Sequence, residues 1–425
     1  MSENFFEYIK SRGFIHQCTN ESNLKLELSK KMVTGYIGFD CTADSLHVGS
    51  LLPIMLLKSF QKFNHKPIIL IGGGTTLIGD PSGKDETRKI IDEETINVNK
   101  EKLKLIFEKY LDFDPRNKNS AVLVDNHDWL KHLKYISFLR KVGKSFSVNK
   151  MLNLESVKQR LQREQNLSFL EFNYSIFQAY DFLELFQHYE CKVQFGGSDQ
   201  WGNIVSGIDL IKKEAKEEVF GLTTPLLTTS SGNKMGKTAE GAIWLSSEKL
   251  KPFDFWQFWR NTADEDVIKF LNLFTEIEKQ DLIKYEQKLD SEINNLKIVL
   301  ANEVTSMCHS RDDAKKCEND AKRIISNKKL DYSLIKSSEK KILVDASTIS
   351  NGFPLKEALT KLELTSSSSE AKRMITQGAV KINDTLISAK EFKITKELFI
   401  SEDSKNYYLI IYVGKKNFGF IELVS

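Results

Sequence analysis

The stretch from Thr34 to Ser50 constrains the fold most, because it reads as a strand, a turn and the start of a helix. Apolar side chains from 51 to 63 follow the 3.6-residue spacing of a helix. We expect Asp44 or Ser45 to cap the start of that helix. The residues that alternate with the period of a strand are Val33, Gly35, Ile37 and Phe39.

The turn from Leu46 to Ser50 carries groups that suit an anion. Gly49 lets a ligand approach the backbone, and His47 offers a donor near the positive end of a helix. A polar turn in front of a core helix would explain the same residues if they stood alone. The turn therefore suggests a phosphate site without establishing one.

Three further apolar runs predict strands of the same sheet, at 66–74, 121–125 and 192–195. Helical segments separate these runs, and glycines or polar residues follow them. This alternation predicts an α/β fold with a doubly wound, parallel, Rossmann-like sheet. Ligands bind beyond the carboxyl ends of such strands, so we expect the polar clusters to meet there.

Changes in residue pattern divide the chain into four parts. We expect a Rossmann-like domain over 1–250, an α-helical domain over 251–325, a linker over 326–352 and a small α+β module over 353–425. Ser367 and Glu370 fit a capping box, which predicts the start of a helix within the module.

Composition excludes several classes of protein. The 425 residues carry a formal net charge of +3, which by itself does not indicate a nucleic-acid partner. The five cysteines are scattered without a C-x-x-C pair, which argues against disulfides and a zinc site. The first residues show no apolar run typical of a signal peptide or a membrane span. We expect a cytosolic protein.

Two glycine-rich stretches imitate nucleotide-binding loops. Residues 79–84 and 232–237 each place three residues between a glycine and a Gly-Lys pair, whereas a P-loop needs four. Gly72–Gly74 is followed by Leu77 where a dinucleotide fingerprint requires a third glycine. The chain therefore lacks the dinucleotide-binding signature that an oxidoreductase with a similar sheet would carry.

Two motifs together resemble a known family. His47–Ser50 is similar to the HIGH box, and Lys234–Thr238 to the KMSKS box, of class I aminoacyl-tRNA synthetases. Residues 39–40, 79–84, 178–181 and 194–203 and the C-terminal module extend the likeness to the bacterial-type tyrosyl-tRNA synthetases over essentially the whole chain. Ser50 departs from the pattern, because the family usually has a second histidine there. Its hydroxyl can donate a hydrogen bond, so the histidine's role is carried over only in part.

The resemblance implies a reaction and its partners. ATP, accompanied by a magnesium ion, would activate L-tyrosine to tyrosyl-adenylate with release of pyrophosphate, and tyrosine would then pass to the terminal ribose of tRNA(Tyr). Such a step depends on positioning and charge neutralisation more than on a protein nucleophile. The family also implies a homodimer, and no membrane is expected.

The resemblance also assigns residues to roles. On the sequence alone, Lys84 and Arg88 would read as solvated cations. The catalytic set is His47, Thr42, Lys234, Lys237, Thr238, Lys84 and Arg88. The tyrosine site comprises Tyr36, Asp181, Tyr174, Gln178, Asp80, Gln200 and Thr75. The ATP site comprises Gly38, Asp40, His47, Gly49, Ser50, Gly197, Asp199 and Lys237, and no residue is implied as a metal ligand.

The C-terminal module resembles the RNA-binding fold named for ribosomal small-subunit protein four. Its helix would present Lys372 and Arg373 to phosphates. Two alternatives stay open at this point. The tryptophanyl relatives share the nucleotide boxes, although the pair Tyr36 and Asp181 argues against them. A non-catalytic RNA-binding paralogue could keep the fold, although the complete tyrosine set and Lys237 argue against it.

Overall fold

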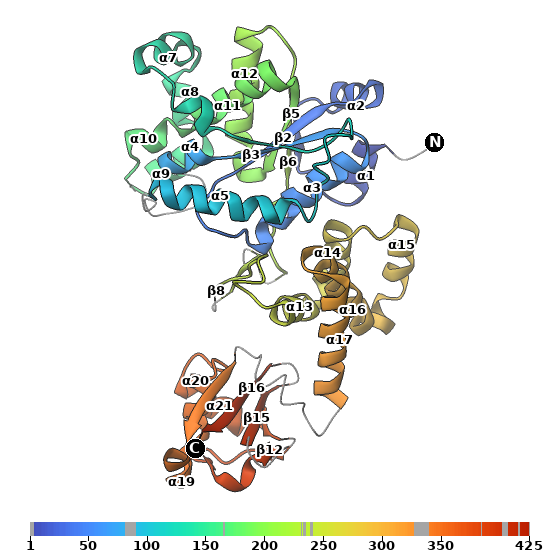
Figure 1. Cartoon of the computed structure of the whole chain (residues 1–425), viewed down its shortest axis with the longest axis vertical. Coiled ribbons are helices and arrows are strands. Elements are labelled where there is room, and N and C mark those ends of the chain that lie inside the picture. Colours follow the sequence, from blue (N-terminus) through green and yellow to red (C-terminus); the bar gives the residue numbers. More distant parts are fainter. Residues whose placement is uncertain are drawn as a thin grey trace. The chain divides into compact units, whose positions relative to one another are not determined.

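The computed structural model describes residues 4–80, 91–164, 166–230, 232, 235–238, 241–326, 340–383, 385–401, 407–414 and 417–424. The chain forms two compact units, Met1–Ala314 and Lys315–Ser425, and each is described by itself. Figure 1 shows the elements of both. In the part of the chain that the structure describes, no helix combines the length and the apolar character needed to cross a membrane.

The first unit contains a six-stranded sheet in the order β1-β6-β5-β2-β3-β4. Its five parallel strands confirm the predicted doubly wound sheet. The chain starts the parallel set at the centre, so the strand order reverses between β2 and β5, where ligands bind in such folds. The strands are β1 (Gln17–Cys18, antiparallel), β2 (Thr34–Phe39), β3 (Lys66–Ile71), β4 (Val122–Asp125), β5 (Cys191–Gly197) and β6 (Phe220–Thr224).

Helices cover both faces of this sheet (Figure 1). On one face, Tyr36 packs against Phe182 of α11 with ring centroids 5.3 Å apart. On the other, Phe195 packs against Phe60 of α3 at 5.2 Å. The covering helices include α3 (Leu51–Lys62), α4 (Gly73–Ile78), α5 (Glu93–Phe107), α11 (Tyr174–Tyr189) and α12 (Trp201–Glu214).

Shorter elements complete the sheet region. They are α1 (Phe5–Ser11), α2 (Glu21–Lys30), α6 (His127–Leu130), α7 (Tyr135–Lys141), α8 (Val148–Leu152), α9 (Glu155–Gln162), α10 (Phe169–Phe172), the two-residue strands β7 (Lys237–Thr238) and β8 (Gly241–Ala242), and the 3₁₀ turns η1 (Val48–Ser50) and η3 (Ser198–Gln200).

Helices follow the sheet, as the pattern of 251–325 predicts. Three aromatic residues of α13, Phe255, Trp256 and Trp259, are fully buried, and the Trp256 indole N–H donates to Asn302 Oδ1 on α16 at 2.8 Å. The helices are α13 (Pro252–Arg260), α14 (Val267–Phe274), α15 (Lys279–Gln287), α16 (Leu289–Cys308) and α17 (Arg311–Ser326).

The second unit packs helices against a sheet in the order β12-β11-β15-β16-β9, with β14 beside β15. Ser367 caps α21 through the N–H of Glu370, as predicted, but Glu370 accepts from Ser366 rather than Ser367. The elements are β9 (Lys341–Asp345), α19 (Ala346–Ser350), β10 (Phe353–Pro354), α20 (Leu355–Lys361), α21 (Ser368–Thr376), β11 (Val380–Ile382), β12 (Thr385–Ile387), β13 (Lys393–Ile394), β14 (Ile400–Ser401), β15 (Tyr407–Val413) and β16 (Asn417–Val424).

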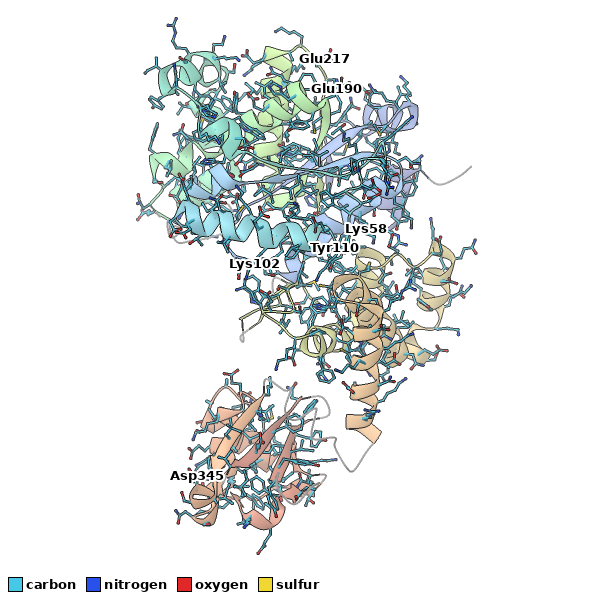
Figure 2. All side chains as sticks on the ribbon, viewed as in Figure 1. Lys58, Lys102, Tyr110, Glu190, Glu217 and Asp345 are labelled. Carbon is cyan, nitrogen blue, oxygen red and sulfur yellow. The ribbon has the colours of Figure 1, made fainter. Side chains whose placement is uncertain are left out.

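The expected linker over 326–352 is wrong in its second half. Residues 341–345 form β9, which pairs in parallel with β16. Asp345 (Figure 2) then caps α19, because its Oδ1 accepts the N–H of Thr348 at 2.7 Å. Hydrogen bonds from the Ser347 hydroxyl and from Thr348 lower the Asp345 pKa to about 2. The polar residues of 326–340 mask the short apolar run Ile342–Val344 that follows them, and the partner of this strand lies some 80 residues away in sequence.

Arg12 joins the first helix to the helical region of the same unit. Its guanidinium is 6% exposed and donates to the carbonyls of Asn272 at 3.0 Å, Thr275 at 2.7 Å and Ile277. These carbonyls lie at the end of α14 and just beyond it, where helix carbonyls lack intrahelical partners.

We expect Arg12→Met to lower the free energy of unfolding by about 3 kcal/mol, because buried carbonyls lose charged donors. Urea unfolding followed by circular dichroism measures this loss. The control is Lys10→Met, which removes only a surface ion pair of Lys10 with Glu21 and should change stability by less than about 1 kcal/mol. Equal stability of the two variants would contradict the role of Arg12.

Candidate active site

A cavity of about 360 Å³ opens at the carboxyl ends of β2, β3 and β5. This is the edge at which the strand order reverses, as predicted. Most of the residues expected for the substrates line it: Tyr36, Gly38, Asp40, Thr42, His47, Gly49, Ser50, Thr75, Asp80, Tyr174, Gln178, Asp181, Gly197 and Gln200. Asp199 lies beside it in η3, where a Cβ built on Gly197 would meet Asp199 Oδ1 at 2.5 Å.

His47 has a defined tautomer at the mouth of this cavity. Its Nδ1 accepts the N–H of Gly49 at 3.0 Å, which makes His47 the cap of η1. A neutral imidazole that accepts at Nδ1 carries its proton on Nε2, so His47 can donate from Nε2. The predicted cap by Asp44 or Ser45 is wrong: Asp44 pairs with Lys102 and Lys249, and Ser45 Oγ accepts the N–H of Ser246.

Residues 243–246 hold the 235–238 segment beside this turn. The N–H of Val48 donates to Ile243 O at 2.8 Å, and the N–H of Ile243 donates to Gly236 O at 3.1 Å. Gly236 has φ +89°, and a Cβ there would meet Val48 Cγ1 at 2.8 Å and Gly49 N at 3.1 Å. The two motifs far apart in the sequence are therefore in contact, and Gly236 leaves room for that contact.

Five of the expected phosphate-binding residues do not appear among the lining residues of the cavity. Lys84, Arg88 and Lys234 lie outside the described residues, so the structure does not place them. Lys237 belongs to β7, two residues after Met235 and next to the His47 turn through Gly236. Thr238 is the second residue of β7 and pairs with Gly241.

Asp181 and Tyr36 form the closed end of the cavity. Asp181 is 2% exposed and accepts from Asn126 Nδ2 at 2.9 Å and from the Trp129 indole at 2.8 Å. Tyr36 is 1% exposed, and its hydroxyl has no hydrogen-bond partner among the described residues. A carboxylate and a hydroxyl thus face a space that a polar group of a ligand can enter.

Burial raises the pKa values of both groups. Loss of hydration raises the Asp181 pKa to about 7, although the hydrogen bonds from Asn126 and Trp129 oppose this shift. Burial and the nearby Asp181 charge raise the Tyr36 pKa well above its usual value. Asp181 is therefore poised between two protonation states near neutral pH, and Tyr36 remains a neutral hydroxyl.

Polar groups from α4, α11, η3 and two loops line the middle of the cavity. Thr75 Oγ1 donates to Asp40 Oδ1 at 3.1 Å, and Gln200 Nε2 donates to Asp80 Oδ2 at 3.1 Å. Gln178 Oε1 is buried without a partner among the described residues. Acceptors therefore predominate here, which suits a ligand that carries an ammonium group.

Comparisons with known proteins agree with this geometry. A sequence profile for tRNA synthetases class I (W and Y) matches residues 28–326, and one for the Tyrosine--tRNA ligase SYY-like C-terminal domain matches 335–421. The Tyrosine--tRNA ligase of Pelagibacter ubique is 49% identical over 421 residues, which cover 99% of both chains. That of Beijerinckia indica is 47% identical and covers 93% of both. The chain belongs to the tyrosine–tRNA ligases of class I.

Solved structures extend the same likeness. A C-terminally truncated mitochondrial tyrosyl-tRNA synthetase of Aspergillus nidulans has a TM-score of 0.68 and 29% identity, and the match covers 76% of this chain and 94% of that one. A tryptophanyl-tRNA synthetase of Encephalitozoon cuniculi, at 15% identity and a TM-score of 0.54, shares the fold.

Sequence reasoning about this tyrosine–tRNA ligase misses two residues of the closed end, Asn126 and Trp129. A signal for Asn126 exists, because it directly follows the strand predicted at 121–125 and so lies at the carboxyl edge of the sheet. Trp129 offers no comparable signal, since its indole reaches Asp181 across 52 positions of sequence.

Lys372 and Arg373 lie on α21 of the second unit. Both side chains are exposed, yet each meets a carboxylate. Lys372 pairs with Glu391 at 3.3 Å, and Arg373 pairs with Glu370 at 3.7 Å. Their positive charge is therefore partly balanced within the module.

We expect the Trp129 indole N–H resonance to titrate with a midpoint at pH about 7, because its acceptor Asp181 has its pKa raised to about 7 by burial. Proton–nitrogen NMR from pH about 9 to about 5 follows this change, and Asp181→Asn should abolish it. The absence of any change over this range, as for a carboxyl with the ordinary pKa of 3.8, would show that Asp181 is hydrated.

Proposed function

We infer that this protein is a tyrosine–tRNA ligase that activates L-tyrosine with ATP and transfers it to the terminal ribose of tRNA(Tyr). One observation carries the inference: Asp181 and Tyr36 close a cavity whose mouth is formed by the His47 turn. The closed end has the polarity that a phenol requires, and the mouth has the donors that phosphates require.

The tyrosine substrate would lie with its phenol at Asp181 and Tyr36. The phenol O–H donates to the Asp181 carboxylate, and the Tyr36 hydroxyl supplies a second hydrogen bond. Phenylalanine would leave these buried groups unpaired, and tyrosyl enzymes are the established example of such rejection. Asp80, Tyr174, Gln178 and Thr75 then face the amino end, and Gln200 faces the reacting carboxylate.

ATP would lie across the mouth. His47 donates from Nε2 and Thr42 from its hydroxyl toward the phosphates, and Ser50 adds a hydroxyl where relatives usually have histidine. Gly38, Gly49 and Gly197 admit the nucleotide close to the backbone. Asp40 and Asp199 accept from its hydroxyl or amino groups, and Asp199 is suited to the ribose.

The activation step is an attack of the tyrosine carboxylate on the α-phosphorus, with pyrophosphate leaving on the opposite side. The protein aligns the two substrates and neutralises the charge that develops on pyrophosphate. Lys84, Arg88, Lys234, Lys237 and Thr238 are proposed for that neutralisation. No side chain needs to form a covalent intermediate.

A magnesium ion is proposed to accompany ATP. Among the described residues, no group of three or more His, Cys, Asp or Glu side chains could hold a metal ion. Such an ion would be held by phosphate oxygens and water, as is usual for magnesium.

We propose that 1–250 acts as the catalytic domain, that 251–325 contacts tRNA, and that the module at 353–425 binds RNA in the cytosol. In the module, Lys372 and Arg373 would exchange their carboxylate partners for phosphates, so binding should weaken with salt. The tryptophanyl alternative is disfavoured, because an indole has no acceptor for Tyr36 and would not fill the role of the phenol.

A homodimer is proposed through the outer surface of α7–α10. Figure 1 shows these helices together on one side of the unit. This surface carries the large exposed apolar side chains of Tyr135, Ile136, Val148, Leu152, Leu161, Phe169 and Leu170. An apolar surface of this kind is typical of protein interfaces.

Exchange of labelled pyrophosphate into ATP tests the activity. We expect exchange with tyrosine and none with phenylalanine or tryptophan. Asp181→Ala and Lys237→Ala should each lower it by roughly 100-fold or more, because each removes a group that contacts a substrate. Asp128→Ala and Lys118→Ala, at exposed positions, should leave it unchanged. No exchange with any amino acid would favour the RNA-binding paralogue.

Light scattering after size exclusion tests the dimer. Phe169 is 71% exposed, and Phe169→Glu should give a monomer, because a charge would be buried in an apolar interface. Leu105→Glu is the control, since Leu105 is 61% exposed on α5 outside the surface. A dimer that survives Phe169→Glu would place the interface elsewhere.

A further inference from the structure

Helix α5 supports the active-site cavity from outside. None of its residues lines the cavity, but Asn99 is among its buried residues. Figure 1 shows α5 as one of the helices beside the sheet of this unit. Lys102 in α5 and Tyr110 just after it are labelled in Figure 2. Two neighbouring polar residues of α5, Asn99 and Lys100, make the contacts that matter here.

Asn99 holds the turn that follows β2. Its side chain is 5% exposed, and its Nδ2 donates to the carbonyl of Cys41 at 2.8 Å. The N–H of Cys41 donates to Thr76 Oγ1 at 2.9 Å. Both backbone groups of Cys41 are thus fixed by side chains, and the residues on either side of it, Asp40 and Thr42, line the cavity.

Lys100 holds the end of β4. Its ammonium forms an ion pair with Asp125, whose side chain is 11% exposed. The Oδ1 of Asp125 also accepts the N–H of Gly73 at 3.1 Å and that of His127 at 2.9 Å. Asp125 therefore fixes the start of α4 and the position of the next residue, Asn126, which donates to Asp181.

We propose that Asn99 and Lys100 are positioning residues for two different substrates, Asn99 for ATP and Lys100 for tyrosine. The proposal rests on the function inferred above. Asn99 acts through Cys41 on the Asp40–Thr42 turn, and Lys100 acts through Asp125 and Asn126 on Asp181. The first contact of each route differs, the turn after β2 for Asn99 and the end of β4 for Lys100, so the larger kinetic effect of each variant should fall on a different substrate.

Steady-state kinetics of pyrophosphate exchange measure the KM values for ATP and for tyrosine in each variant. Asn99→Ala should raise KM for ATP by roughly tenfold with little change in KM for tyrosine, because a displaced turn misaligns the nucleotide. Lys100→Met should raise KM for tyrosine by roughly tenfold and narrow the preference for tyrosine over phenylalanine, with little change in KM for ATP.

Matched variants distinguish positioning from general damage. Lys104→Met removes an exposed lysine from the same helix and should change neither KM. Lys100→Arg keeps the charge and should recover most of the tyrosine affinity lost in Lys100→Met. Asn99→Ser, a milder change, serves if Asn99→Ala does not fold, and should still raise KM for ATP alone.

The outcomes are distinct. A fall in kcat with both KM values unchanged would mean fewer folded molecules and would overturn the positioning roles. Equal changes in KM for ATP and KM for tyrosine in both variants would overturn them too. The wild-type enzyme is assayed beside them. Absence of exchange in the wild type would reject the inferred function, whereas normal wild-type exchange with unaltered variants would reject only the present proposal.

Discussion

The side-chain amide of Asn126 is the interaction on which the rest of the site depends. Its Oδ1 accepts the N–H groups of Gly74 at 2.8 Å and Thr75 at 3.4 Å, at the start of α4. Its Nδ2 donates to Thr75 Oγ1 at 3.0 Å and to Asp181 Oδ2 at 2.9 Å. One amide thereby joins the end of a strand, the start of a helix and the closed end of the cavity. Since an amide has two donors and an acceptor oxygen, this residue has no hydrogen-bonding capacity to spare.

A buried carboxylate that can bind a phenol lowers the stability of the folded protein at neutral pH. Burial raises the Asp181 pKa from 3.8 to about 7, so the folded state favours the protonated acid. The stability that this preference contributes is fully present below pH 3.8 and is lost as the pH rises through about 7. At neutral pH the protein therefore holds a carboxylate that hydration would stabilise better. Two donors offset part of that cost, and a phenol hydroxyl adds a third.

Sequence reasoning succeeds where a signal is local. Apolar runs predict β2 to β5 and place the cavity at the correct edge of the sheet. Two strands of the first sheet are missed. In β6 (Phe220–Thr224) a glycine and two threonines interrupt the apolar run, and β1 has only two residues. The sequence also gives no signal for contacts between residues that lie far apart in the chain. The cap of η1 comes from His47 rather than an ordinary capping residue, and the donors to Asp181 come from a separate strand end and helix. The roles of the site residues remain predictions.

The sheet of the second unit has a consequence for protein synthesis. Its first strand, β9, pairs in parallel with its last, β16, which lies between β9 and β15. A ribosome releases β9 long before β16, so the sheet cannot close until translation of this region is nearly complete. The parallel sheet of the first unit has all its strands by Thr224 and can form earlier. A chain that stopped before β16 would leave two open strand edges, which chaperones and proteases could recognise as unfinished.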